Sequence, residues 1–268
     1  MTRHVPIWLD RFPKSRRPSY PKLRGESQTD VVIIGGGLTG CACALSFAAA
    51  GVKCVVVEAD RIGAAATAGS IGLVREDFDA SLMNHASAYG LRAARLLWQG
   101  MRRASLDLQA AIRRFEIRCD LVPQELLRLA PRQGDAGKQL EREYRARREA
   151  GLDHSWVTAA ALKRETSIDA SVAIRSRGAA LDPYRACLGF ASAAAARGAA
   201  IFEHSCVRRI RVKRKLVEIA TASGSIQADA VVVATGASLA EGQAGGVPSA
   251  SGAADRITNV PAGLTANE

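Results

Sequence analysis

Three glycines at fixed spacing and one glutamate are the residues of this chain best suited to hold a ligand. Gly35-x-Gly37-x-x-Gly40 follows the apolar run VVII, and Glu58 closes a second apolar run about 20 residues after the glycines. The first glycine permits a tight turn, the second lets the backbone approach a pyrophosphate, and the third lets a helix pack against a strand. A helix that starts at this turn directs free N–H groups at the phosphates. The spacing therefore predicts a dinucleotide site in which Glu58 binds the adenosine ribose. The alternative is a glycine-rich turn in an unrelated α/β protein.

The histidines and cysteines predict neither a metal site nor a nucleophile. The four histidines have no metal-ligand spacing, and the six cysteines form no CxxC pair. Most of the cysteines lie in apolar runs, where a free thiol acts as a small hydrophobic group. We therefore expect no metal and a reducing compartment. No Ser/His/Asp or Cys/His set is apparent, so the catalytic residues stay unknown.

The segments around the glycines have the pattern of one βαβ unit. VVIIG and VKCVVVEAD are predicted to be buried strands, and residues 38–50 form the helix between them, with Gly51 as its C-cap. Two such strands joined by a helix are expected to be parallel. Further along, GAALDPYRACLGF predicts a helix that ends at Gly198 and leads to a strand. RVKRKLVEIATASGSIQADAVVVATG predicts a hairpin that ends in a buried strand.

The middle of the chain is predicted to be mainly helical. Apolar residues recur at helical spacing over residues 81–115, a length that predicts a break at Gly90 or Gly100. LVPQELLRLAP indicates a short strand or hairpin, and helices are expected near residues 135–150 and 159–165. Residues 1–29 are expected to be an extended arm with Trp8 and Phe12 as candidate anchors, and residues 238–268 a disordered tail.

With these segments in place, the sequence resembles the FAD-dependent amine and amino-acid oxidoreductases of the D-amino-acid-oxidase and glycine-oxidase type. The matching segments are DVVIIGGGLTG, VVVEADRIG, GAALDPYRACLGFASAAAARGAAIFEHSCVRRI and ADAVVVATGAS. The fold class this resemblance implies is α/β, a Rossmann-like FAD/NAD(P)-binding domain with a partial α+β substrate domain. It implies a discontinuous FAD-binding domain over residues 30–80 and 166–237, with a helical and partial substrate domain over residues 81–165.

The resemblance also implies FAD as the cofactor and roles for individual residues. Thr39 and the three glycines would hold the FAD pyrophosphate, Glu58 the adenosine ribose, and Val207 the adenine through its backbone. The alternatives are that Val207 and Ala234 are plain strand core and that Arg61 is a surface arginine. The full set of implied cofactor-binding residues is Gly35, Gly37, Leu38, Thr39, Gly40, Glu58, Ala59, Arg61, Ala66, Thr67, Val207, Ala234, Thr235 and Gly236.

Two features depart from the family pattern. The family loop after the second strand usually reads like GASGRNGG, whereas this chain has AATAGSIG, with Gly69, Ser70 and Ile71 at the changed positions. Such enzymes also continue well past the ATG strand. We therefore expect a truncated version of a longer flavoenzyme.

The expected function is oxidation of the C–N bond of an amine or amino acid by hydride transfer to FAD, in a truncated form whose activity stays open. A non-catalytic dinucleotide-binding fragment is one alternative. A basic interaction module is another, because the net charge is +11. The arginines are scattered along helix-like segments, and the cluster at residues 208–215 falls in the predicted hairpin, which favours a solvated surface over a nucleic-acid site.

The expected partners are an amine or amino-acid substrate and a protein or second copy that covers an exposed sheet edge beside the VVVATG strand. No stretch approaches the roughly 18 apolar residues of a membrane span. We therefore expect no membrane span and a cytoplasmic location.

Overall fold

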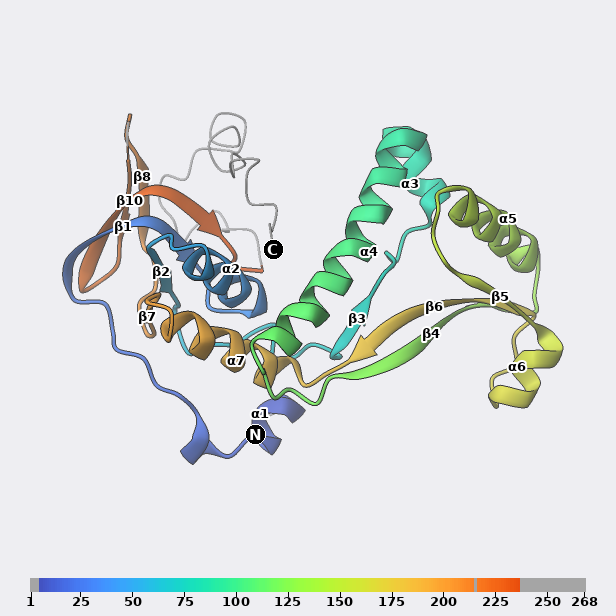
Figure 1. Ribbon diagram of the computed structural model, residues 1–268, viewed down its shortest axis with the longest axis horizontal. Helices are drawn as coiled ribbons and strands as arrows, with labels where there is room; N and C mark the ends of the chain where they lie inside the picture. Colours follow the sequence, from blue (N-terminus) through green and yellow to red (C-terminus); the bar gives the residue numbers. More distant parts are fainter. Residues whose placement is uncertain (1–4, 215, 237–268) are drawn as a thin grey trace. The chain divides into compact units, whose positions relative to one another are not determined.

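The computed structural model describes residues 5–214 and 216–236, so the tail expected at residues 238–268 lies outside the described residues. The chain divides into two compact units. The first unit comprises the chain up to Ile71 and from Pro183 onward, and the second unit is Gly72–Asp182 (Figure 1).

The first unit is built on a six-stranded sheet in the order β7-β2-β1-β10-β9-β8. β1, β2, β7 and β10 pair in parallel, and β9 and β8 continue the sheet in antiparallel pairing beside β10. The α/β class, the parallel βαβ unit and the hairpin are thus confirmed, and β10, which ends with the three valines of the VVVATG segment, is an interior strand. The strands are β1 (Gly25–Ile34), β2 (Cys54–Val57), β7 (Ala200–Phe202), β8 (Arg209–Val212), β9 (Val217–Ala220) and β10 (Gly224–Val233).

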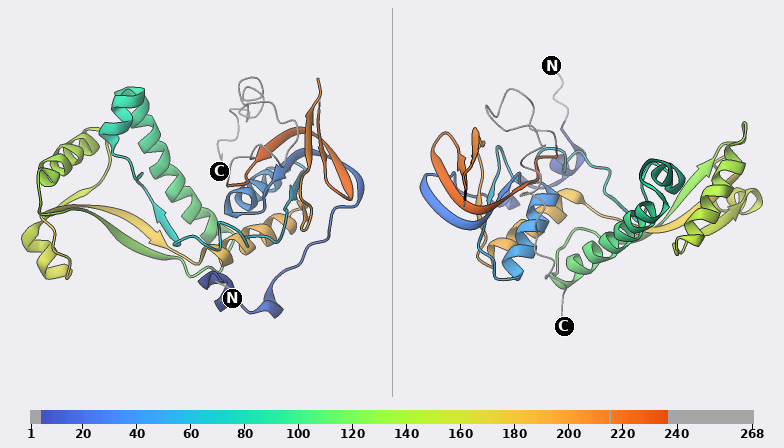
Figure 2. Two further views of the ribbon diagram at one scale, coloured as in Figure 1. Left: turned by 180° about the vertical axis from the view of Figure 1, so that it is seen from behind. Right: turned by 90° about the horizontal axis from the view of Figure 1, so that it is seen from above.

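Two helices, α2 (Leu38–Ala49) and α7 (Pro183–Ala195), pack against each other on one face of this sheet (Figures 1 and 2). The strands beneath them are continuous apolar runs because both of their faces are buried. Val32 and Val55 belong to the core on the opposite face. Gly51 follows α2 with a φ of +76°, the left-handed conformation that the sequence predicted for its C-cap.

The N-terminal residues are more ordered than expected. The short helix α1 (Ile7–Arg11) and the 3₁₀ helix η1 (Lys14–Arg16) lie within the segment predicted to be an extended arm, so that prediction was wrong there. β1 also begins at Gly25 rather than after residue 29. Its polar first half pairs with the first half of β10, whose Ile226 is fully buried, so pairing with β10 extends β1 beyond its own apolar run.

The second unit contains an antiparallel sheet in which β6 pairs with β3, β4 and β5. α4 packs on β3, and α5 packs on β4 and β6. The helical stretch predicted over residues 81–115 breaks at Gly90, which has a φ of +83°, and continues through Gly100. The elements are β3 (Leu73–Arg75), α3 (Leu82–Tyr89), α4 (Leu91–Arg114), β4 (Val122–Ala130), α5 (Ala136–Glu149), β5 (Ser155–Thr158), α6 (Ala159–Glu165) and β6 (Val172–Ala180).

The division between the units differs from the one expected at residues 80 and 166. β3 and β6 both lie in the second unit, because β6 pairs with β4 over its full length and with β3 at its end. These pairings join segments far apart in the chain, so no local pattern indicates them.

The second unit has a partly ionic core. Arg147 is fully buried, and its Nε donates to Glu143 Oε1 at 2.7 Å, while its guanidinium carbon lies 4.4 Å from the centre of the Trp98 ring. Arg147 Nη1 also lies 3.4 Å from Asp77 Oδ2 and 3.5 Å from His154 Nδ1. Burial and the positive charge of Arg147 lower the pKa of His154 to about 4. The imidazole is therefore neutral at physiological pH.

Candidate cofactor-binding site

A pocket of about 570 Å³ lies in the first unit at the carboxyl ends of three parallel strands. Gly35 lines it after β1, Glu58 after β2, and Ala234 after β10. β1 lies between β2, the next strand along the chain, and β10, the last described strand, so the strand order changes direction at β1. Open α/β sheets bind ligands at this kind of switch point. The pocket volume is also within the range of small-molecule sites.

The turn after β1 has room for glycine alone at two positions. Gly35 has a φ of +107°, and a Cβ there would lie 2.5 Å from the Ala234 carbonyl oxygen. A Cβ on Gly40 would lie 1.9 Å from the Gly35 carbonyl oxygen. The first glycine thus lets β1 and β10 end side by side, and the third lets α2 start directly against the turn.

The start of α2 supplies backbone donors to the pocket. The N–H groups of Leu38 and Thr39 have no carbonyl of their own helix to bond, because they belong to its first turn. The Leu38 N–H donates to Thr67 Oγ1 at 3.0 Å. This helix end carries a positive partial charge. The arrangement fits a phosphate group.

Glu58 holds the turn and faces the pocket. Its Oε2 accepts from the Gly36 N–H at 2.6 Å, and its Oε1 accepts from the Asp60 N–H at 2.9 Å. A carboxylate offers about four acceptor positions. Capacity therefore remains for hydroxyl groups of a bound ribose.

A loop after β2 closes one side of the pocket. Arg61, Gly63, Ala66 and Thr67 line the pocket, and the Gly63 N–H donates to the Gly36 carbonyl at 2.9 Å. Small side chains in this loop leave its backbone accessible to a ligand.

Two thiols form the back of the glycine turn. Cys41 Sγ and Cys187 Sγ each lie 3.5 Å from the Gly36 carbonyl oxygen and 3.7 Å from each other. The hydrogen bond with Cys41 and burial raise the pKa of Cys187 well above its ordinary value. The Cys187 thiol is therefore not suited to act as a nucleophile.

The structure brings thirteen of the fourteen sequence-predicted site residues into the pocket lining; Gly40 instead packs behind the turn. Val207 and Ala234 lie outside the strands and line the pocket. Sequence reasoning did not name Ala64, Ala65 or Cys206, which also line it. Their position in the sequence was the available signal. Ala65 and Cys206 directly precede the predicted residues Ala66 and Val207, and Ala64 follows the loop glycine Gly63.

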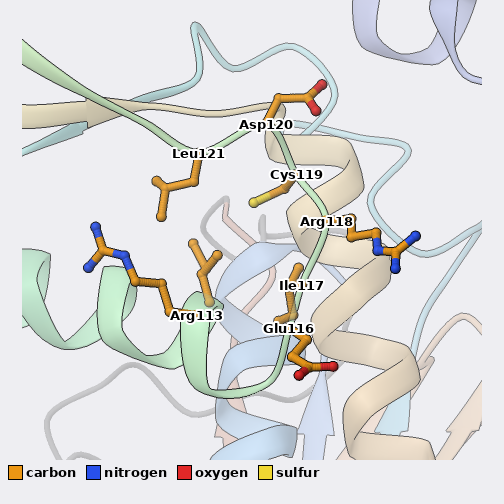
Figure 3. A pocket seen from close by; sticks show the side chains of 8 residues that line it. Arg113, Glu116, Ile117, Arg118, Cys119, Asp120 and Leu121 are labelled. Atoms are coloured by element: carbon orange, nitrogen blue, oxygen red, sulfur yellow. The ribbon is translucent and has the colours of Figure 1, made fainter.

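A second hollow, of about 680 Å³, lies in the second unit where α4 leads into β4. Figure 3 shows the charged groups of Arg113, Glu116, Arg118 and Asp120 turned in different directions rather than toward one point. We therefore assign it no chemistry. No cluster of three or more potential metal ligands occurs within residues 5–214 and 216–236. In the same described part of the chain, no helix is long and apolar enough to cross a membrane.

Comparison with known proteins identifies the family. A family model described as FAD dependent oxidoreductase matches residues 30–253. The chain belongs to this family. FAD is the cofactor of these flavoproteins, and the glycine turn, the helix N-terminus and Glu58 fit the pyrophosphate and ribose of FAD.

Individual members of the FAD-dependent oxidoreductase family match over much of this chain. Gamma-glutamylputrescine oxidoreductase of Escherichia coli is 29% identical over 248 residues, which are 90% of this chain and 56% of the relative. The structure of glycine oxidase from Geobacillus kaustophilus matches with a TM-score of 0.62 and 25% identity, over 78% of this chain and 55% of that one. The structure of L-proline dehydrogenase from P. horikoshii, at 22% identity and a TM-score of 0.63, shares the fold over 80% of this chain. The chain spans about half the length of these relatives.

Proposed function

We propose that the first unit binds FAD in the pocket at the ends of β1, β2 and β10. We further propose that the protein oxidises a C–N bond of an amine or amino acid. The observation that carries the proposal is the convergence of a bare glycine turn, a helix N-terminus and Glu58 on one pocket. When bound, FAD supplies the hydride acceptor for this oxidation.

In this proposal, different residues of the pocket bind different parts of FAD. The N–H groups at the start of α2 donate to the pyrophosphate, and Glu58 accepts from the ribose hydroxyls. Glu58 also disfavours a 2′-phosphate at this position, because the two negative charges would repel. The backbone of Val207 would contact the adenine, and Thr67 would lie near the pyrophosphate; both residues line the pocket. The second unit, residues 72–182, is the partial substrate domain in this proposal.

A weaker candidate is a chain that binds the adenine dinucleotide without turnover. Glu58, Arg61 and Cys206 are the ionisable residues in the described lining, and two of them are assigned to the cofactor. The relatives named above are about twice as long as this chain, so residues that it lacks could contribute to their activity. FAD binding and amine oxidation are therefore separate claims.

Titration of the purified 268-residue chain with FAD tests the first claim, with ADP as competitor. We expect saturable quenching of flavin fluorescence that ADP reverses and that Glu58→Ala weakens. Loss of flavin absorbance after anaerobic addition of an amine or amino acid tests the second claim. Binding without such bleaching favours the non-catalytic candidate, and absence of both FAD and ADP binding contradicts the proposal.

A further inference from the structure

The N-terminal residues 5–23, here called the strap, contact the loop that lines the pocket. The indole N–H of Trp8 donates to the Ser70 carbonyl oxygen at 2.8 Å. The Phe12 ring packs edge-on against Tyr184, with centroids 5.5 Å apart, and Arg17 Nη2 donates to the Leu9 carbonyl. The strap thus has its own anchors on α7 and reaches the far end of the loop.

A single buried carboxylate joins the strap to the other end of the loop. Glu203 follows β7 and is 3% exposed. Its Oε2 accepts from the Tyr20 N–H at 3.1 Å, and its Oε1 accepts from the Ile62 N–H at 2.8 Å. The Glu203 N–H also donates to the Pro21 carbonyl at 3.1 Å, so the contact with the strap is two-sided.

The loop segment that Glu203 holds lies directly beside the cofactor pocket. Ile62 is 1% exposed and stands between Arg61 and Gly63, both of which line the pocket. The Gly63 N–H donates to Gly36, the residue whose own N–H bonds Glu58. A displacement at Ile62 would therefore reach the glycine turn within two hydrogen bonds.

We propose that Glu203 and Trp8 are positioning residues through which the strap holds the loop at residues 61–71 in its FAD-binding shape. This inference rests on the proposed FAD site. A loop that is already ordered loses little conformational freedom when a ligand binds, so its affinity is higher than that of the same loop left mobile. Without these two contacts, FAD must order the loop itself.

The main test compares two glutamate-to-glutamine variants in the full chain. Glu203→Gln turns an amide NH₂ toward one of the two backbone N–H donors, so we expect FAD to bind about tenfold or more weakly. Glu143→Gln is the matched control. Glu143 is also buried and accepts from two backbone N–H groups, those of Leu82 and Met83, but it lies in the second unit. It should destabilise the protein and leave the FAD dissociation constant unchanged.

Trp8→Phe keeps an aromatic ring and removes the indole donor, and because Trp8 is only half-buried the variant should fold. We expect it to weaken FAD binding about two- to tenfold, the effect of one hydrogen bond. If Glu203→Gln and Trp8→Phe lower the unfolding midpoint but bind FAD as tightly as the Glu143→Gln control, the positioning role is refuted.

Limited trypsin digestion of the FAD-free protein gives a readout that does not depend on cofactor binding. Cleavage at the Arg61–Ile62 bond should be several times faster in Glu203→Gln than in the wild-type chain, and unchanged in Glu143→Gln. Equal cleavage rates in all three proteins would overturn the inference. Failure of the wild-type chain to bind FAD would instead contradict the proposed function, while the cleavage rates would still test the strap.

Discussion

Gly40→Ala should reduce both FAD binding and stability. The added Cβ would lie 1.9 Å from the Gly35 carbonyl oxygen, so the helix start and the turn must separate by about 1.1 Å to reach a tolerable 3.0 Å contact. Overpacking of this kind destabilises a protein by about 1–3 kcal/mol. The same shift moves the first N–H groups of α2 away from the phosphates. Loss of one hydrogen bond to a charged group, about 1.5–3 kcal/mol, weakens binding at least about tenfold.

A second glycine on the same helix gives the matched control. Gly51 follows the other end of α2 with a φ of +76°, and nothing lies within 4 Å of a Cβ placed there. Gly51→Ala should cost about 1–2 kcal/mol of stability through backbone strain and leave FAD affinity unchanged. The assay is a FAD fluorescence titration alongside urea unfolding of each variant. A Gly40→Ala protein that binds FAD as tightly as Gly51→Ala would refute the role given to the helix start.

Three further predictions concern the second unit. Because folding lowers the pKa of His154 from 6.5 to about 4, the unfolded chain binds more protons between these pH values. His154 therefore contributes about 3 kcal/mol of stability above pH 6.5 that is lost as the pH falls toward 4; urea unfolding across this range should show that slope, and His154→Gln should lose it. Arg147→Leu removes the cation bonded to the buried Glu143 and one of the three arginines around Asp77, so it should destabilise the unit by about 3–5 kcal/mol; a loss under about 1 kcal/mol in urea unfolding contradicts the paired-charge account. Gly100→Ala, in the interior of α4 with open space around its Cβ, should raise stability by about 0.5–1 kcal/mol in the same assay, and a decrease would show an unrecognised contact.

The parts of the fold that the sequence predicted are those with local causes. The strands around Val32 and Val55 are continuous apolar runs. The residue after α2 adopts a left-handed backbone conformation, which favours glycine, and Gly51 occupies that position. The break at Gly90 was one of two choices, and both glycines look alike in the sequence. The structure distinguishes them, because Gly90 adopts a positive φ and Gly100 stays helical.

Long-range pairings explain what the sequence did not show. β6 mixes Arg175 and Arg177 with apolar residues and becomes a strand through its partner β4, which lies far away in the chain. Arg147 sits in a helix whose composition predicted a solvated surface, yet it is fully buried between Glu143 of the same helix and the distant Asp77. The pairing with Asp77 has no signature in a single sequence.

The candidate site shows the same division. Its glycine turn and Glu58 form one compact motif, so their spacing alone predicted their chemistry. Glu203 and Trp8 contact the same loop through its backbone groups, the Ile62 N–H and the Ser70 carbonyl. Backbone contacts depend on the fold rather than on residue type, and the sequence predicted only that Trp8 would be an anchor.

Alkylation of Cys206 with and without FAD tests the location of the cofactor most directly. Cys206 lines the pocket and is exposed, whereas Cys41, Cys54, Cys119 and Cys187 are buried. A thiol reagent followed by mass spectrometry should modify Cys206 first in the FAD-free chain, and saturating FAD or ADP should slow that reaction strongly. Cys206→Ser should remove the fast-reacting thiol and keep FAD binding. Unchanged modification of Cys206 in a chain that has bound FAD would place the cofactor elsewhere and contradict the account.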